Sequence, residues 1–118
     1  MTLLKKIVFA KIVLALALLI PGLASTAQKI DPKLIIGRWR GADDKKSELV
    51  FTNDKQIDYY GGKQVAVNTY LIRHDSLMTI DVKYGDTLYY DIDKVNKQTL
   101  SLLYLGRGNM LLYRRVQE

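Results

Sequence analysis

After residue 27, apolar and polar residues alternate with a period of two in eight short segments, separated by turn-like stretches. These segments are rich in Tyr, Val, Ile and Thr, a composition that favours β-strands. No intervening stretch is long enough for a crossover helix, so we expect each strand to pair antiparallel with the next. The predicted strands are Leu34–Arg40, Ser47–Thr52, Gln56–Gly61, Val67–Arg73, Ser76–Val82, Thr87–Asp93, Thr99–Leu105 and Met110–Val116.

The alternation predicts one buried face, and closure of the sheet protects its edges. An open sheet would leave two unpaired edges, whereas pairing the first strand with the last removes both. We therefore predict an all-β fold, an eight-stranded antiparallel up-and-down barrel, with a two-sheet sandwich as the alternative. Asp31 followed by Pro32 predicts one short helical turn at the closed end. The residues expected to face inward are Asn68, Tyr70 and Ile72; Met78, Ile80 and Val82; Leu88, Tyr90 and Ile92; and Leu100, Leu102 and Tyr104.

Residues 1–27 have the layout of a secretory signal peptide. Two lysines precede an apolar run, and small residues at Ser25 and Ala27 suit cleavage after Ala27. A membrane anchor is the alternative, but the uninterrupted run Ile12–Ile20 is well short of the roughly 20 residues that span a bilayer. The chain has no cysteine, which excludes a lipidated N-terminal cysteine. We therefore expect a signal peptide over 1–27, a barrel domain over 28–118, and export to the periplasm or the medium, with membrane contact only through the signal.

The charge of the predicted mature chain is modest. Losing Lys5, Lys6 and Lys11 leaves 15 basic residues against 12 acidic ones, a net charge of +3. Basic and acidic residues are interleaved without a basic block, so no nucleic-acid partner is expected. With no disulfide available, burial must stabilise a domain of this size, which favours a well-filled core. The sequence does not indicate an oligomeric state.

The sequence offers no catalytic constellation. His74 is the only histidine and lies in a predicted hairpin turn, and there is no cysteine, so no zinc or copper site is expected. Four aspartates on and between two paired strands are candidates for calcium binding or acid–base work, but the outward positions of Asp91 and Asp93 favour solvated charges. We expect no enzyme activity, no metal and no cofactor. These aspartates are Asp81, Asp86, Asp91 and Asp93.

The only tryptophan lies on the first predicted strand. Gly37 and Trp39 share one face, and the barrel prediction places the last strand beside them. An arginine there can lie over the indole in a cation–π contact worth about 0.5–2 kcal/mol. Arg115 shares a face with Tyr113 and is the preferred partner, with Arg114 as the alternative. Trp39 is expected to be a packing anchor rather than a ligand contact.

A Gly-x-Trp on the first strand and an arginine on the last resemble the pattern of the short, secreted lipocalin-like domain proteins of Bacteroidetes-type bacteria. The resemblance covers Leu34 to Val116, and it implies a closed barrel with Gly37, Trp39 and Arg115 as its structural signature. The chain differs from full-length lipocalins in its shorter strands and loops and in lacking their C-terminal helix. The other matching segments are Glu48–Phe51, Tyr70 with Ile72, Tyr89–Ile92 and Tyr113–Arg115.

Three tyrosines are the candidates for lining a ligand site. Tyr70, Tyr90 and Tyr104 are expected to point inward, with Tyr59 a further candidate; such a lining suits a small hydrophobic ligand at the open end. Alternatively, these rings simply fill the barrel. The sequence thus predicts an exported, non-enzymatic, lipocalin-like binding protein. The alternative function is a solid-core envelope interaction module that presents an outer apolar patch of tyrosine pairs with Leu103, Leu105 and Leu111.

Overall fold

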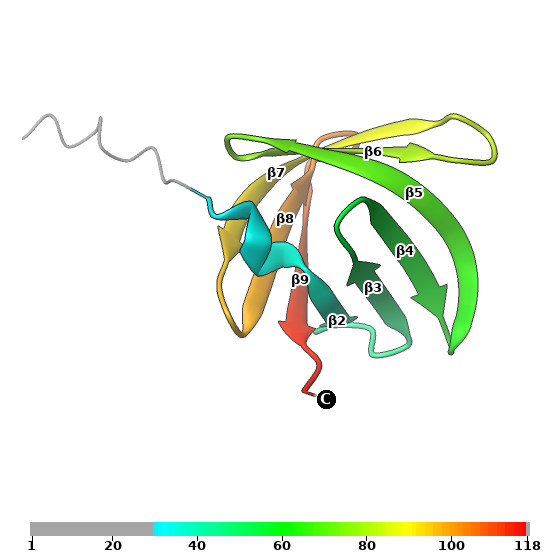
Figure 1. Ribbon diagram of the computed structural model, residues 1–118. Coiled ribbons are helices and arrows are strands. Elements are labelled where there is room, and N and C mark those ends of the chain that lie inside the picture. The colour runs from blue at the N-terminus through cyan, green and yellow to red at the C-terminus, as the bar shows by residue number, and fades with distance from the viewer. Residues whose placement is uncertain (1–29, 118) are drawn as a thin grey trace, which may run out of the picture.

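Eight antiparallel strands form a closed barrel in the computed structural model, which describes residues 30–117. Each strand pairs with its neighbours in sequence, so the barrel is an up-and-down meander (Figure 1). The predicted barrel is confirmed, and the predicted signal peptide lies outside the described residues. The strands are β2 (Gly37–Gly41), β3 (Ser47–Phe51), β4 (Lys55–Tyr60), β5 (Lys63–Arg73), β6 (Ser76–Asp81), β7 (Thr87–Val95), β8 (Thr99–Tyr104) and β9 (Asn109–Arg115).

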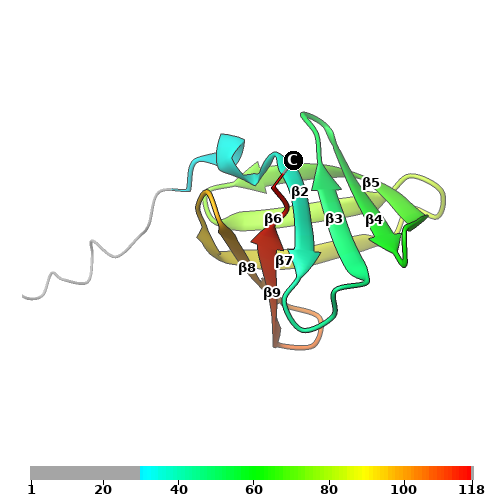
Figure 2. The ribbon, with the colours of Figure 1, turned by 90° about the horizontal axis from the view of Figure 1, so that it is seen from below.

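The barrel closes between its first and last strands. β2 pairs antiparallel with β9, with Trp39 opposite Arg115 and Gly41 opposite Tyr113. Figure 2 shows these two strands side by side. Closure leaves neither strand as a free edge, which is the reason the barrel is preferred over the sandwich.

A short 3₁₀ helix, η2 (Pro32–Ile35), precedes the barrel, where the sequence predicted a helical turn. The Asp31 carboxylate accepts a hydrogen bond from the Lys33 backbone N–H at 3.0 Å, and Pro32 occupies the first turn, as expected for a helix start. The first strand therefore begins at Gly37, three residues later than predicted, because Leu34 and Ile35 belong to this helix.

The inward face is predicted correctly on β5, β7 and β8 and wrongly on β6. Asn68 is buried on β5, Ile92 on β7, and Leu100 and Leu102 on β8. On β6 the buried residues are Leu77 and Thr79. Residues Met78 and Ile80, expected inside, are only partly buried, and Val82 lies beyond the strand and is exposed. The register explains the error, because Leu77 lies opposite inward-facing Ile72 and Thr79 lies opposite inward-facing Tyr70.

A β-bulge interrupts the β4–β5 ladder. Asp58 pairs with Ala66 and Tyr59 pairs with Gln64, so Val65 is the additional residue on β5. β5 also starts earlier than predicted, because Gly61 and Gly62 alone form the preceding turn, with φ angles of 60° and 84°. Bulges change the direction of side chains and are common beside binding sites.

Ile35 of η2 belongs to the buried core, and we name the end of the barrel that η2 covers the closed end (Figure 1). The opposite rim, the open end, carries the loops 42–46, 61–62, 82–86 and 105–108. Among residues 30–117, no helix is long and apolar enough to cross a membrane. The core residues are Ile35, Trp39, Phe51, Leu77, Ile92, Leu100, Leu102 and Tyr113.

Candidate ligand-binding site

The closed end is fixed by Trp39 and Arg115. The indole is fully buried, and its Nε1–H donates to the Ile35 carbonyl oxygen at 2.8 Å, which joins η2 to the barrel. The guanidinium carbon of Arg115 lies 4.0 Å from the centroid of the Trp39 ring. Arg115, and not the exposed Arg114, therefore makes the cation–π contact.

The guanidinium of Arg115 also connects three backbone carbonyls from two segments, the η2 region and the β7–β8 turn. Its Nε–H donates to the Lys97 carbonyl at 2.7 Å, Nη1–H donates to the Ile36 carbonyl at 2.8 Å, and Nη2–H donates to the Leu34 carbonyl. Gly37 makes room for this side chain, because a Cβ at this position would lie 2.4 Å from Nη1. These contacts close one end of the barrel.

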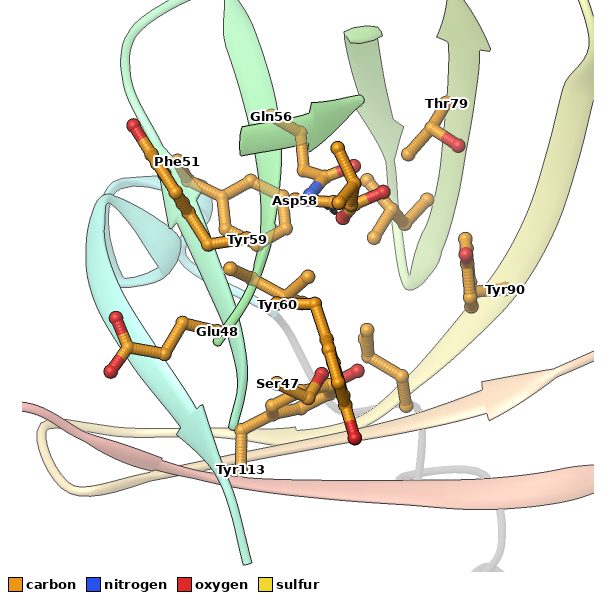
Figure 3. Close-up of a pocket in the computed structure, with 14 residues that line it drawn as sticks. Ser47, Glu48, Phe51, Gln56, Asp58, Tyr59, Tyr60, Thr79, Tyr90 and Tyr113 are labelled. Atoms are coloured by element: carbon orange, nitrogen blue, oxygen red, sulfur yellow. Dashed lines mark hydrogen bonds between the residues drawn. The ribbon is translucent and has the colours of Figure 1, made fainter. Parts of the chain in front are cut away.

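A cavity of about 300 Å³ opens at the other end of the barrel. Its size is at the lower end of the range for small-molecule sites, so it suits a small ligand. Figure 3 shows side chains from opposite walls of the barrel facing the same space. The lining residues are Ser47, Glu48, Leu49, Phe51, Gln56, Asp58, Tyr59, Tyr60, Val65, Leu77, Thr79, Tyr90, Leu102 and Tyr113.

One side of the cavity is a polar wall formed by Gln56, Asp58 and Thr79, from β4 and β6. Gln56 donates through Nε2 to Asp58 Oδ1 at 2.6 Å, and its Oε1 accepts from Asn68 Nδ2 at 2.8 Å. Gln56, Asn68 and Thr79 are buried, and Asp58 is partly buried. Asn68 therefore orients the Gln56 amide, and that amide in turn holds the Asp58 carboxylate in place.

Asp58 is the chemically unusual member of the polar wall. Burial raises the pKa of its carboxyl group above the ordinary value, and the hydrogen bonds from Gln56 and Asn68 only partly oppose this effect. None of the described residues forms an ion pair with it. Glu48, the other acidic lining residue, is paired with Arg38 at 2.8 Å and Arg40 at 3.0 Å, and Figure 3 shows its carboxylate directed away from the cavity. Asp58 thus gives the cavity a negative charge whenever it is ionised.

Tyrosines form much of the remaining wall. Burial raises the pKa of Tyr90 to about 12 and also raises the pKa of Tyr113, and the charge of Asp58 acts in the same direction on both. Both phenols therefore stay neutral and can donate hydrogen bonds at physiological pH. Together with Phe51 and Tyr60 they surround the cavity with aromatic rings.

Of the three tyrosines expected to line a site, the structure places Tyr90 on the cavity wall. Tyr104 packs against Tyr90 with ring centroids 5.4 Å apart and does not line this cavity. Tyr70 makes an edge contact with Phe51, and its hydroxyl donates to the Thr52 carbonyl, in the turn between β3 and β4. Tyr59 borders the cavity, but its ring lies against the Arg38 guanidinium.

Sequence reasoning missed Asp58, Gln56, Thr79 and Tyr113 as site residues. In the segment Gln56–Tyr60, the apolar side chains of Ile57 and Tyr59 suggest that they point inward. The pattern therefore assigns Gln56 and Asp58 to the outer face. The available signal was the inverted pattern itself, since an inward-facing Gln and Asp on a strand imply a buried polar site.

The other candidates for chemistry lie elsewhere. His74 is exposed in the β5–β6 turn with a φ of 59°, and Asp81 accepts hydrogen bonds from the backbone N–H groups of Lys83 and Tyr84. Asp86 and Asp93 are exposed, and Asp91 is partly buried. Among the residues described, no group of three or more His, Cys, Asp or Glu side chains is placed to hold a metal ion.

An apolar groove lies on the outer surface, across β5, β6 and β7. Leu71, Tyr89 and Leu105 are about half exposed, and Met78 lies between them in a groove of about 440 Å³. Leu105 thus belongs to an outer patch, as predicted, whereas the expectation for Leu111 is wrong. Leu111 packs against the core, because it lies two residues before inward-facing Tyr113 on β9.

No protein-family model and no curated protein matches this sequence. Among solved structures, a lipocalin-like protein from Bacteroides uniformis superimposes with a TM-score of 0.58 and 13% sequence identity. The match covers 70% of this chain and 99% of that protein. The fold is lipocalin-like. Because identity is so low, the comparison establishes the barrel and its likeness to a Bacteroides protein, but it does not transfer a ligand or a role.

Proposed function

We propose that this lipocalin-like barrel is an exported, non-enzymatic protein that binds a small, partly apolar molecule in the cavity at its open end. The cavity is the observation that carries the proposal, since a solid-core interaction module would require a filled barrel. The layout of residues 1–27 supports export.

The character of the cavity wall supports binding rather than packing alone. Leu77, Leu102 and Phe51 supply apolar surface, while Gln56 and Tyr90 present polar atoms to the same space. This combination of apolar walls and a few fixed polar groups is typical of small-molecule sites. On β4 and β6, moreover, polar residues face inward while Ile57, Met78 and Ile80 lie on the outer face. Such a departure from ordinary patterning is expected at a functional site.

The test is a binding screen with a matched pair of variants. The isotope-labelled protein is titrated with a set of small aromatic and aliphatic compounds while backbone amide chemical shifts are followed. We expect at least one compound to cause saturable shifts in the residues that line the cavity. Ser47→Phe places a ring beside Tyr60 and Tyr113 at the mouth and is expected to abolish them, whereas Thr69→Phe, an exposed position that does not line the cavity, is expected to preserve them.

Two results would refute the proposal. One is the absence of saturable shifts with every compound in the set. The other is saturable shifts confined to the outer groove around Leu71 and Tyr89, which would favour the alternative of an interaction module that binds through its outer surface.

A further inference from the structure

We infer that the cavity selects ligands that carry a positively charged amine attached to a small apolar body, with Asp58 as the residue that recognises the charge. This inference rests on the proposed function and adds the chemical class of the ligand. The geometry that supports it is a single unpaired carboxylate fixed inside a ring of aromatic side chains.

The charge of the cavity favours cations. Its fourteen lining residues include no Lys, Arg or His, and the only other acid among them, Glu48, is neutralised by two arginines on the outer surface. The carboxylate of Asp58 therefore has no opposite charge among the described side chains. A bound ammonium group would supply the missing partner, and a carboxylate ligand such as a fatty acid would be repelled.

The position of Asp58 is controlled by its neighbours. The hydrogen bond from Gln56 occupies one carboxylate oxygen, and Gln56 is itself held by Asn68 across the β4–β5 ladder. The adjacent bulge places Val65 at the mouth of the cavity. A carboxylate oriented in advance loses little side-chain entropy on binding, which favours specific recognition over a mobile surface charge.

The aromatic lining matches the same ligand class. Phe51, Tyr60, Tyr90 and Tyr113 border the cavity, and ring faces attract cations within about 6 Å of the centroid. Tyrosine is neutral at pH 7 at its ordinary pKa, and burial raises the pKa of Tyr90 and Tyr113 further, so neither ring adds a second negative charge beside Asp58. A primary amine with one small ring therefore finds a hydrogen-bond acceptor, aromatic side chains and apolar surface in one cavity.

The experiment compares three probes of similar size that differ in charge: 2-phenylethylamine, 2-phenylethanol and phenylacetate. Affinities are measured by calorimetry and amide shifts at pH 7 with the full chain. We expect the amine to bind about tenfold or more tighter than the alcohol, since both can donate a hydrogen bond to the Asp58 carboxylate but only the ammonium group adds an opposite charge. Phenylacetate is expected not to bind.

Asp58→Asn is the matching variant, because an amide oxygen at this position can still accept the hydrogen bond from Gln56. We expect it to weaken amine binding about tenfold while changing alcohol binding far less, because the alcohol loses no charge–charge attraction. Asp54→Asn, in the exposed β3–β4 turn, removes the same charge outside the cavity and is expected to leave both affinities unchanged. The emission of buried Trp39 verifies that each variant is folded.

Each outcome separates this inference from the proposed function. Equal affinities for amine and alcohol would overturn the charge selectivity, and an amine preference that persists in Asp58→Asn would overturn the role of Asp58. Both results would leave the binding function standing. The same holds if only uncharged compounds from the wider screen bind. If neither these probes nor any screened compound binds, both conclusions fail. If Asp58→Asn does not fold, equal affinities of the wild type for the amine and the alcohol still overturn the inference.

Discussion

Replacing Arg115 by Lys or Met tests how the closed end is held together. The guanidinium donates to three backbone carbonyls and lies 4.0 Å from the Trp39 ring centroid. Lysine keeps the charge but cannot reach carbonyls in three directions, and methionine keeps only the apolar stem. Both variants should therefore destabilise the barrel, and Arg115→Met should lower the free energy of unfolding more than Arg115→Lys.

The expected loss in free energy of unfolding follows from how exposed to water each hydrogen bond of Arg115 is. The hydrogen bonds to Ile36 and Lys97 lie at exposed sites, where water replaces the donor, so each is worth roughly 0.5 kcal/mol. The bond to Leu34 is partly buried and is worth roughly 1.5 kcal/mol. Losing most of these bonds predicts a cost of about 2 kcal/mol for Arg115→Lys. Losing the cation–π contact as well raises it to about 3 kcal/mol for Arg115→Met.

Urea unfolding followed by the emission of Trp39, the only tryptophan, gives these free energies directly. For a domain of this size, about 2 kcal/mol also corresponds to a fall in Tm of roughly 8–16 °C. Arg114→Met is the matched control. Arg114 is exposed and lies opposite Arg40, so its loss removes a like-charge pair and should cost less than about 0.5 kcal/mol. The reasoning is refuted if Arg115→Lys is as stable as the wild type, or if Arg114→Met costs as much as Arg115→Met.

Three further predictions concern Gly37, Glu48 and the N-terminus. Gly37→Ala is expected to lower the free energy of unfolding in urea by about 1–3 kcal/mol, because φ is +136° and the new Cβ would displace the Arg115 guanidinium. If Gly37→Ala destabilises the Arg115→Met variant as much as the wild type, the clash with the guanidinium is not the cause. Glu48→Gln should cost about 0.5–1 kcal/mol at pH 7, since the two arginines that hold the carboxylate are well exposed. The hydrogen bond from Arg38, and secondarily the one from Arg40, lowers the pKa of Glu48. The stability that Glu48 contributes is therefore present above the ordinary carboxyl pKa and should disappear as the pH falls below about 4. A stability difference between Glu48→Gln and the wild type that is constant down to about pH 2.5 would contradict the ion-pair explanation. Intact-mass measurement of the exported protein should show a chain that starts at Gln28, and recovery of the uncleaved chain in the membrane fraction would favour an anchor instead.

The fold was predictable because its determinants are local. Short Gly-, Asn- and Asp-containing turns leave no room for crossovers, and the strand segments between them are unambiguous. The contact between Trp39 and Arg115 followed from closure, because an up-and-down barrel must bring its first and last strands together. Leu34 and Ile35 were misassigned to a strand because the Asp31–Pro32 start commits the chain to a helical turn that overrides their β propensity.

The site was much less predictable, because period-two alternation leaves the phase of each strand open. On β4 the apolar residue Ile57 does not line the cavity, while the polar residues Gln56 and Asp58 face it. The β6 strand is inverted in the same way, with Thr79 inside. Only pairing with β5 sets these phases, and that information is not present in either segment alone.

The most direct test of ligand binding inside the barrel is to measure intermolecular nuclear Overhauser effects in the complex with 2-phenylethylamine. Binding in the cavity predicts contacts between the ligand protons and the side chains of Phe51, Leu102 and Tyr113, which line the cavity and not the outer groove, with none to Leu71 or Tyr89. Contacts only to the outer groove, or a saturated complex without contacts to the cavity residues, would contradict the account.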